Sequence, residues 1–245
     1  FKGDFMQKSS ARRFIEAYNQ IDYALRVQHN FKRSMGYSDM IRRAVAVNYI
    51  VRKYEDDLID FGRLRNAIIH RSNDDYIIAE PHDDVVIQME KIAKLICTPP
   101  KVMEILNLHD VLTVNYDVDL KTVIKLISTS KYSNIPVYKE GTLLGVANGQ
   151  KILNLLGKKI DEGQDISRYI ESTSIEQAIS EFPEGVTYYE IAPSDVTIEA
   201  VLDMFDKNRK LLIVLITKTG SMQEAPLGIV TPTNIMDLNN ILENY

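Results

Sequence analysis

Cysteine and tryptophan are nearly absent from this chain of 245 residues, which has one Cys, no Trp and four His. A single thiol, Cys97, excludes an intramolecular disulfide and a zinc site built from several cysteines. The four histidines show no spacing typical of metal ligands, so we expect no bound metal. The lone cysteine also favours a reducing compartment, and we expect a cytoplasmic protein.

Long apolar runs are missing too. No stretch of eighteen apolar residues occurs, so we expect no membrane-spanning helix and no membrane partner. The first residues lack the pattern of a secretion signal, and because the chain opens on Phe1 we expect a few native residues to precede it. Glycine-rich nucleotide loops with the GxGxxG pattern, P-loop lysines and the Gly-x-Ser-x-Gly pattern are absent. Hydrophobic residues nevertheless make up 45% of the chain, which is enough for a folded core.

Charge is unevenly distributed along the chain. Residues 1–71 hold 14 Lys and Arg against 8 Asp and Glu, a net charge of +6, which leaves −11 for the remaining residues. Ten of the twelve arginines lie in this first segment. Such an asymmetry indicates either a surface that meets anions, including RNA, or solvated helix faces with ion pairs four residues apart.

Apolar periodicity predicts an all-helical bundle over residues 1–100. A helix over 9–29 carries apolar residues at three- and four-residue steps. A second helix starts after Ser38 and continues to His70, with a kink or break expected near Phe61-Gly62 because glycine interrupts the pattern. A third opens at Asp83 or Asp84 and stops before two prolines.

The second half of the chain contains an internal repeat. Residues 145–153 are similar to residues 228–236, which lie 83 positions later. The helix-like residues 120–127 are similar to residues 198–205, which lie 78 positions later. Each copy reads as strand, helix, strand, strand, helix, so the two are expected to bury their apolar faces against each other. The predicted fold class is α+β, with a helical domain over 1–100 and a repeat domain over 101–245. The copies lie at about 101–160 and 183–245.

Each copy also has a glycine-hydrophobic turn followed by polar residues, and in the second copy this reads Gly228-Ile229-Val230-Thr231 with Asn234 three residues on. With the order of elements, this turn resembles a tandem CBS-domain pair, also called a Bateman module, over residues 101–245. The resemblance implies an adenine nucleotide as regulatory ligand (AMP, ADP, ATP or cyclic di-AMP) and a homodimer.

The second copy carries the candidate nucleoside site. A Thr231 hydroxyl at a strand-to-helix turn, with free backbone N–H groups, suits a phosphate, and Asn234 can hold ribose hydroxyls. The alternative is that Thr231 only caps the last helix. The expected walls of the site are Thr187, Tyr188, Lys210, Leu211 and Leu212.

The first copy departs further from the family pattern. It has Asn148 at the Ser/Thr position and Lys151 where the family has an acidic residue. A lysine cannot accept hydrogen bonds from a ribose, although it could neutralise a phosphate. We therefore expect at most one good nucleoside site.

A second resemblance lies in the helical half. Arg65-Asn66-Ala67-Ile68-Ile69-His70 matches an Arg-x4-His pattern, and with the surrounding bundle it resembles the HEPN domain, many members of which are metal-independent ribonucleases. This resemblance implies catalytic roles in RNA cleavage, with His70 as acid or base, Arg65 on the phosphate and Asn66 orienting the ring. Arg65 points about 140° away from His70 on a straight helix, so a kink or a dimer is needed. The structural alternative is that these residues only form salt bridges and end the helix.

Three hypotheses follow for function. The first is a regulatory protein whose CBS pair binds an adenine nucleotide and modulates the helical dimer. The second adds metal-independent RNA cleavage by Arg65, Asn66 and His70, so whether the protein is an enzyme stays open. The alternative is a non-catalytic interaction or scaffold protein with degenerate nucleotide sites.

Overall fold

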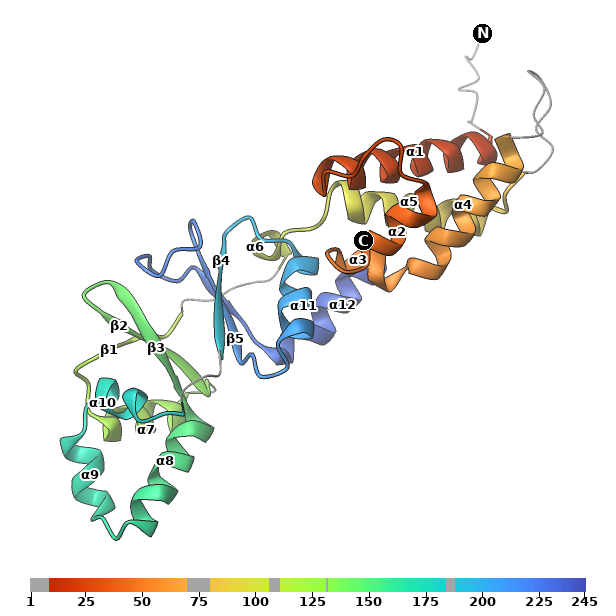
Figure 1. Ribbon diagram of the computed structural model, residues 1–245. Helices are drawn as coiled ribbons and strands as arrows, with labels where there is room; N and C mark the ends of the chain where they lie inside the picture. Colours follow the sequence, from red (N-terminus) through yellow and green to blue (C-terminus); the bar gives the residue numbers. More distant parts are fainter. Residues whose placement is uncertain (1–8, 70–79, 106–110, 131, 184–187) are drawn as a thin grey trace. The chain divides into compact units, whose positions relative to one another are not determined.

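The fold comes from a computed structural model that describes residues 9–69, 80–105, 111–130, 132–183 and 188–245. The chain divides into two compact units: residues 1–101, 197–203 and 237–245 form the helical unit, and residues 102–196 and 204–236 form the sheet unit. The first unit is helical, and the second combines helices with sheets, so the mixed helix and sheet content agrees with the predicted α+β class (Figure 1). Two helices, α11 (Ile198–Lys207) and α12 (Ile235–Asn244), have residues in both units.

The helical unit is built around α1 (Ser10–Gln28), which packs lengthwise against α5 (Asp83–Cys97). The Ser9 side chain accepts a hydrogen bond from the backbone N–H of Arg12 and so caps the start of this helix. The apolar stripe of α1 is buried, as its spacing predicts, and includes Phe14, Ile21 and Leu25. Within the described residues, no helix is long and apolar enough to cross a membrane.

The long second helix expected from Ser38 is wrong. Three helices replace it: α2 (Tyr37–Ala44), α3 (Tyr49–Lys53) and α4 (Glu55–Ile69). Asn48 ends the first segment because its side-chain Oδ1 accepts from the N–H of Val51 at 3.0 Å and starts a new helix. Val47, directly before Asn48, is 54% exposed at this break.

The break that the sequence offered as one alternative at Gly62 is absent, because α4 runs through this residue without interruption. Gly62 is buried, and a Cβ atom there would lie 2.9 Å from Cδ1 of Tyr37. The missing side chain therefore lets the Tyr37 ring lie against α4. Tyr37 in turn stacks on Tyr18 of α1, with ring centroids 4.3 Å apart.

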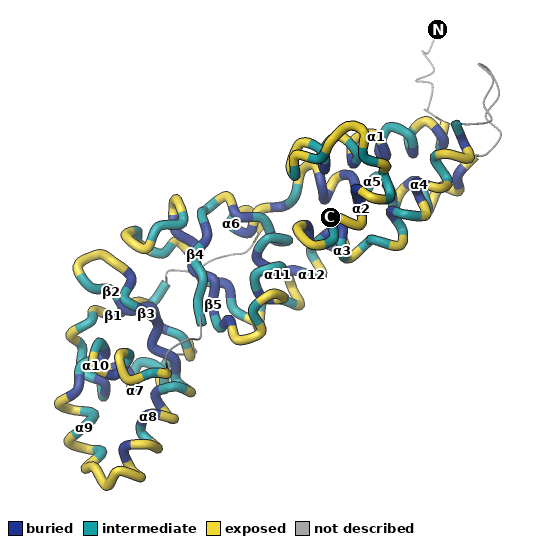
Figure 2. The backbone as a smooth tube through the Cα atoms, viewed as in Figure 1, coloured by how far each residue is buried: buried dark blue, intermediate teal, exposed yellow. Residues whose placement is uncertain are grey.

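The sheet unit contains two three-stranded sheets of the same topology. The first has β1 (Val114–Asn115) parallel to β2 (Asn134–Lys139), which is antiparallel to β3 (Thr142–Asn148). The second has β4 (Tyr189–Pro193) parallel to β5 (Ile213–Thr217), which is antiparallel to β6 (Gly228–Val230). β5 is buried along its whole length, as expected for a continuous apolar run (Figure 2).

Helices accompany both sheets. They are α6 (Val102–Ile105), α7 (Leu120–Thr129), α8 (Gly149–Asp161), α9 (Ile166–Ser172), α10 (Ile175–Ser180) and the short 3₁₀ turn η1 (Pro232–Asn234). One apolar cluster joins the sheets: Leu143 and Val146 of β3 pack with Ile213 and Leu215 of β5. This shared cluster is the packing that the sequence repeat predicts, since each copy buries an apolar face on the other.

Candidate functional site

The sheet unit contains a pocket of about 610 Å³ that we call the Lys151 pocket. A smaller cavity of about 240 Å³ shares six of its lining residues. These six shared residues are Asn148, Lys151, Phe182, Pro183, Tyr188 and Leu212.

Asn148 positions the start of α8. Its Oδ1 accepts from the N–H of Lys151 at 3.0 Å, and its Nδ2 donates to Oδ1 of Asn134 at 2.8 Å. Because the side chain caps the helix, Lys151 is held in the first helical turn. The backbone N–H of Leu212 donates to the carbonyl of Tyr188 at 2.7 Å, which fixes the opposite wall.

Lys151 is the only cation of this pocket whose charged group is enclosed by aromatic rings among the described residues. Its Nζ lies over the face of Tyr188 and 5.4 Å from the ring centroid of Phe182. No described residue accepts a hydrogen bond from this buried Nζ. Burial lowers the pKa of Lys151 from 10.5 to about 8, because the charged form loses its hydration.

Other charged groups also line the pocket. Lys158 and Lys210 contribute cations. Glu181 is the one carboxylate that lines it within the described part of the chain, and it already pairs with Lys159 at 2.5 Å and accepts from Tyr169 at 2.8 Å. These bonds hold the pKa of Glu181 below its usual range. The lining therefore has an excess of positive charge.

The structure groups the predicted nucleoside residues differently from the sequence-based expectation. Tyr188, Lys210 and Leu212 line a pocket with Lys151, whereas Thr231 and Asn234 are not among its lining residues. Leu211 is buried rather than lining the pocket, and Thr187 lies outside the described residues. Phe182 and Pro183 were missed, because residues 157–185 show no binding motif and read only as a connection between the copies.

Thr231 and Asn234 bond to each other. Asn234 Oδ1 accepts from the N–H of Thr231 at 2.9 Å and from its hydroxyl at 3.0 Å. The Thr231 hydroxyl is also 2.6 Å from that of Thr233. Both polar side chains thus take part in the start of η1, in line with the capping alternative.

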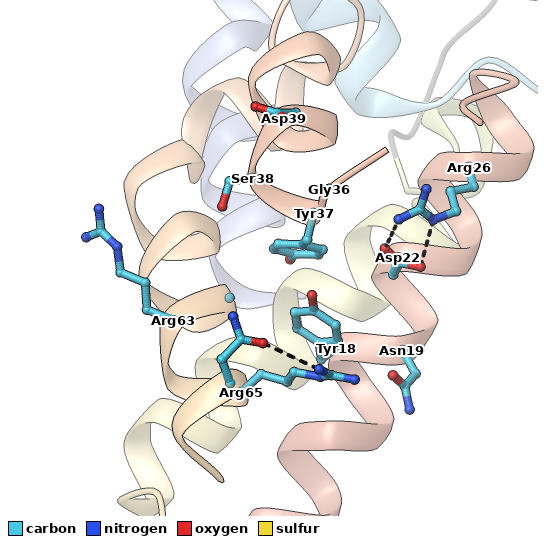
Figure 3. Close-up of a pocket in the computed structure, with 12 residues that line it drawn as sticks. Tyr18, Asn19, Asp22, Arg26, Gly36, Tyr37, Ser38, Asp39, Arg63 and Arg65 are labelled. Atoms are coloured by element: carbon cyan, nitrogen blue, oxygen red, sulfur yellow. Dashed lines mark hydrogen bonds and ion pairs between the residues drawn. The ribbon is translucent and has the colours of Figure 1, made fainter. Parts of the chain in front are cut away.

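The helical unit has a second pocket, of about 480 Å³, which we call the Tyr18 pocket. Side chains of α1, α2 and α4 line it, and Figure 3 shows Arg65 reaching from α4 to Tyr18. Its residues are Tyr18, Asn19, Asp22, Arg26, Gly36, Tyr37, Ser38, Asp39, Gly62, Arg63, Arg65 and Asn66.

Two of the three predicted catalytic residues lie in the Tyr18 pocket, and the third, His70, lies outside the described residues. The guanidinium of Arg65 is 5.3 Å from the ring centroid of Tyr18, and its Nη1 donates to Oδ1 of Asn66 at 3.4 Å. The Nε of Arg65 is buried with no partner in the described structure. Burial raises the pKa of Tyr18 to about 12, so this ring stays neutral beneath the guanidinium.

The part of the chain that contains the first sheet matches a known protein family. Residues 102–158 match the family model of the CBS domain. These residues form a CBS domain. No curated protein sequence matches the chain.

Several solved CBS-domain structures resemble the chain. A CBS domain-containing protein of unknown function from Kribbella flavida is 13% identical, with a TM-score of 0.45, over 58% of this chain and 98% of that one. The CBS domain of a bacterial CNNM/CorC family Mg²⁺ transporter, in complex with ATP, is 18% identical, with a TM-score of 0.43, over 61% and 92%. CBSX2 in complex with AMP is 15% identical, with a TM-score of 0.41, over 59% and 98%.

Proposed function

We propose that the sheet unit binds an adenine nucleotide in the Lys151 pocket and that this binding regulates the helical unit. CBS domains often bind nucleotides and regulate, and this chain contains one. The observation that carries the proposal is the pocket itself: its volume of about 610 Å³ falls in the range of small-molecule sites, and aromatic and cationic groups face one space.

The second sheet supports a second CBS copy over residues 183–245, because its strands repeat the order and directions of the first. Within that copy, Thr231 and Asn234 stay a proposed nucleoside site, in which a ligand would replace their mutual hydrogen bonds. AMP, ADP, ATP and cyclic di-AMP are the proposed ligands. A cytoplasmic location also stays a proposal, based on the single cysteine.

Isothermal titration with each nucleotide tests this function. We expect Tyr188→Ala to weaken binding, because the variant removes a wall of the Lys151 pocket, and Tyr132→Ala, at an exposed tyrosine, to leave it unchanged. If Thr231→Val weakens binding and Tyr188→Ala does not, the ligand occupies the second copy instead. Absence of binding by all four nucleotides at millimolar concentration would refute the proposal.

Regulation requires that the nucleotide bind two arrangements of the protein unequally. Its effect on the helical unit cannot exceed this difference in binding free energy. Hydrogen exchange of α1 and α5, measured with and without saturating nucleotide, tests the regulatory part. Unchanged exchange throughout these helices would leave a nucleotide-binding protein without regulation of that unit.

A second candidate function is RNA binding by the helical unit, which is the HEPN-like proposal. The Tyr18 pocket favours it, because Arg65 lies on an aromatic ring with an unpartnered Nε and can offer donors to a phosphate. RNA cleavage would in addition require His70 as acid or base.

Fluorescence anisotropy with single-stranded RNA tests this candidate. Arg65→Gln should weaken binding, whereas Arg33→Gln, at an exposed arginine outside the pocket, should change it less. Cleavage should disappear in His70→Ala; cleavage that persists in this variant would come from another enzyme. RNA binding without cleavage would favour the non-catalytic interaction protein.

The homodimer is also a proposal. Leu153 and Met236 occupy equivalent positions of the sequence repeat, and they are 61% and 74% exposed. Sedimentation analysis of Leu153→Glu and Met236→Glu tests it, with Met222→Glu as a control at another exposed methionine. A wild-type monomer at micromolar concentration would contradict it.

A further inference from the structure

We propose that Lys151 makes its pocket selective for polyanions: one ligand phosphate pairs with the Lys151 ammonium, so affinity rises from nucleoside to monophosphate to triphosphate. This inference rests on the proposed function only for the nucleoside part of the ligand. The anion site itself follows from the surroundings of Lys151.

The Lys151 ammonium lacks what a charged group in a protein normally has. Its Nζ is buried and donates to no acceptor in the described residues. The faces of Tyr188 and Phe182 offer it cation–π contacts instead. An unpaired buried charge is costly, and cation–π contacts offset only part of that cost. A phosphate oxygen would supply the missing acceptor.

The position of Lys151 on α8 adds to this cost. The first turn of a helix carries partial positive charge, so cations are disfavoured and anions are favoured there. Lys151 lies in the first turn of a helix of 13 residues, with Asn148 as its cap. A bound anion therefore interacts favourably with both the ammonium and the helix start.

Neighbouring charges point the same way. Lys158 and Lys210 line the pocket without a described carboxylate from the opposite wall, while Glu181 is already held by Lys159 and Tyr169. Among the described residues, Lys158 pairs with Glu162 directly after the end of α8, with Nζ 3.8 Å from the carboxylate. A second or third phosphate can thus meet further cations, which explains the expected ranking.

Lysine also decides which part of the ligand lies here. An ammonium group has three donors and no acceptor, so it cannot accept the hydrogen bonds of ribose hydroxyls. It can donate to phosphate oxygens, and a charged pair of this kind is stronger than a neutral hydrogen bond. We infer that the phosphates, rather than the ribose, contact Lys151.

Calorimetric titration of the full chain with adenosine, AMP, ATP and inorganic tripolyphosphate tests the inference. We expect wild-type protein to bind ATP about tenfold or more tightly than AMP, from one added charge-assisted contact. Lys151→Met should weaken the binding of ATP and of AMP and remove the preference for AMP over adenosine, whereas Lys151→Arg should retain much of that preference. Lys125→Met, which removes an exposed charge elsewhere in the sheet unit, should match wild type.

The outcomes separate this inference from the proposed function. Equal wild-type affinity for adenosine and ATP, or unchanged ATP affinity in Lys151→Met, would overturn the inference while nucleotide binding stands. If no nucleotide binds, the proposed function fails, and tripolyphosphate decides the inference: binding that Lys151→Met abolishes supports an anion site, and no binding refutes it. Should Lys151→Met fail to fold, the wild-type ranking of the four ligands still decides.

Discussion

The absence of a side chain at Gly62 leaves room for the Tyr37 ring, and Gly62→Ala tests this directly. The Tyr37 ring stacks on Tyr18, which in turn contacts the guanidinium of Arg65. An alanine Cβ would lie 2.9 Å from Cδ1 and 3.2 Å from Cε1 of Tyr37, closer than carbon atoms pack. Overpacking of this kind costs about 1–3 kcal/mol. Replacing a helical glycine with alanine also stabilises by about 1 kcal/mol, so the net change is a destabilisation of about 0–2 kcal/mol.

Gly157 provides the matched control. It lies in α8, and a Cβ there would meet no atom within 4 Å. Gly157→Ala should therefore stabilise its unit by the full helix-propensity gain of about 1 kcal/mol. The contrast in sign between the two variants isolates the contact with Tyr37, because the chemical change is the same.

Urea unfolding followed by circular dichroism measures both changes, each evaluated at the transition of its own unit. In a Tyr37→Ala background the obstructing ring is gone, so Gly62→Ala should become stabilising by about 1 kcal/mol. The reasoning is refuted if Gly62→Ala stabilises the wild-type protein as much as Gly157→Ala does. It also fails if Tyr37→Ala leaves the effect of Gly62→Ala unchanged.

Three further predictions concern stability and pH. Burial raises the pKa of Glu199 from 4.5 to about 7, so the stability of the wild-type protein should fall as the pH rises from about 4.5 to 7. Glu199→Gln should therefore stabilise the protein by at most about 3 kcal/mol at pH 8 but little at pH 4.5. Denaturation at several pH values checks this, with the exposed Glu140→Gln as control; a gain that does not vary with pH would contradict it. Asn48→Ala should cost about 0.5–2 kcal/mol by removing the cap of α3, and equal stability in urea would count against that role. Because burial lowers the pKa of Lys151 to about 8, wild-type affinity for ATP should fall between pH 7 and 9.5 as the ammonium deprotonates. The other titratable groups that line the pocket are Lys158, Glu181, Tyr188 and Lys210. An ATP affinity that stays constant over this pH range in calorimetric titrations would contradict the prediction.

Elements with strong periodic patterns could be predicted from the sequence. The stripe of α1 repeats at helical spacing over five turns, and the repeated turn at Gly145 and Gly228 marks matching strands. Such patterns predict the structure well because the periodic spacing alone places the apolar residues on one face of the element, where they are buried.

The errors occurred where one side chain or a distant contact decides the structure. Asn48 breaks a continuous apolar pattern through a single side-chain hydrogen bond. The sequence pattern predicts a kink or break at Gly62, whereas α4 continues through this residue and the Tyr37 ring that needs its space is 25 residues away in the sequence. The lining of the Lys151 pocket could not be predicted for the same reason. Tyr188 faces Lys151 of the other copy, and the spacing within one motif carries no information about which copy supplies the opposite wall.

The discontinuous helical unit has a practical consequence for dissecting the protein. Tyr49, Arg52 and Lys53 of α3 bond to Asn239, Asp203 and Glu243, which arrive from much later in the chain but belong to the same unit. A fragment cut after residue 101 would lose Asn239, Asp203 and Glu243 as partners of this short helix. Studies of either half are therefore better made by point substitution in the intact polypeptide than by truncation.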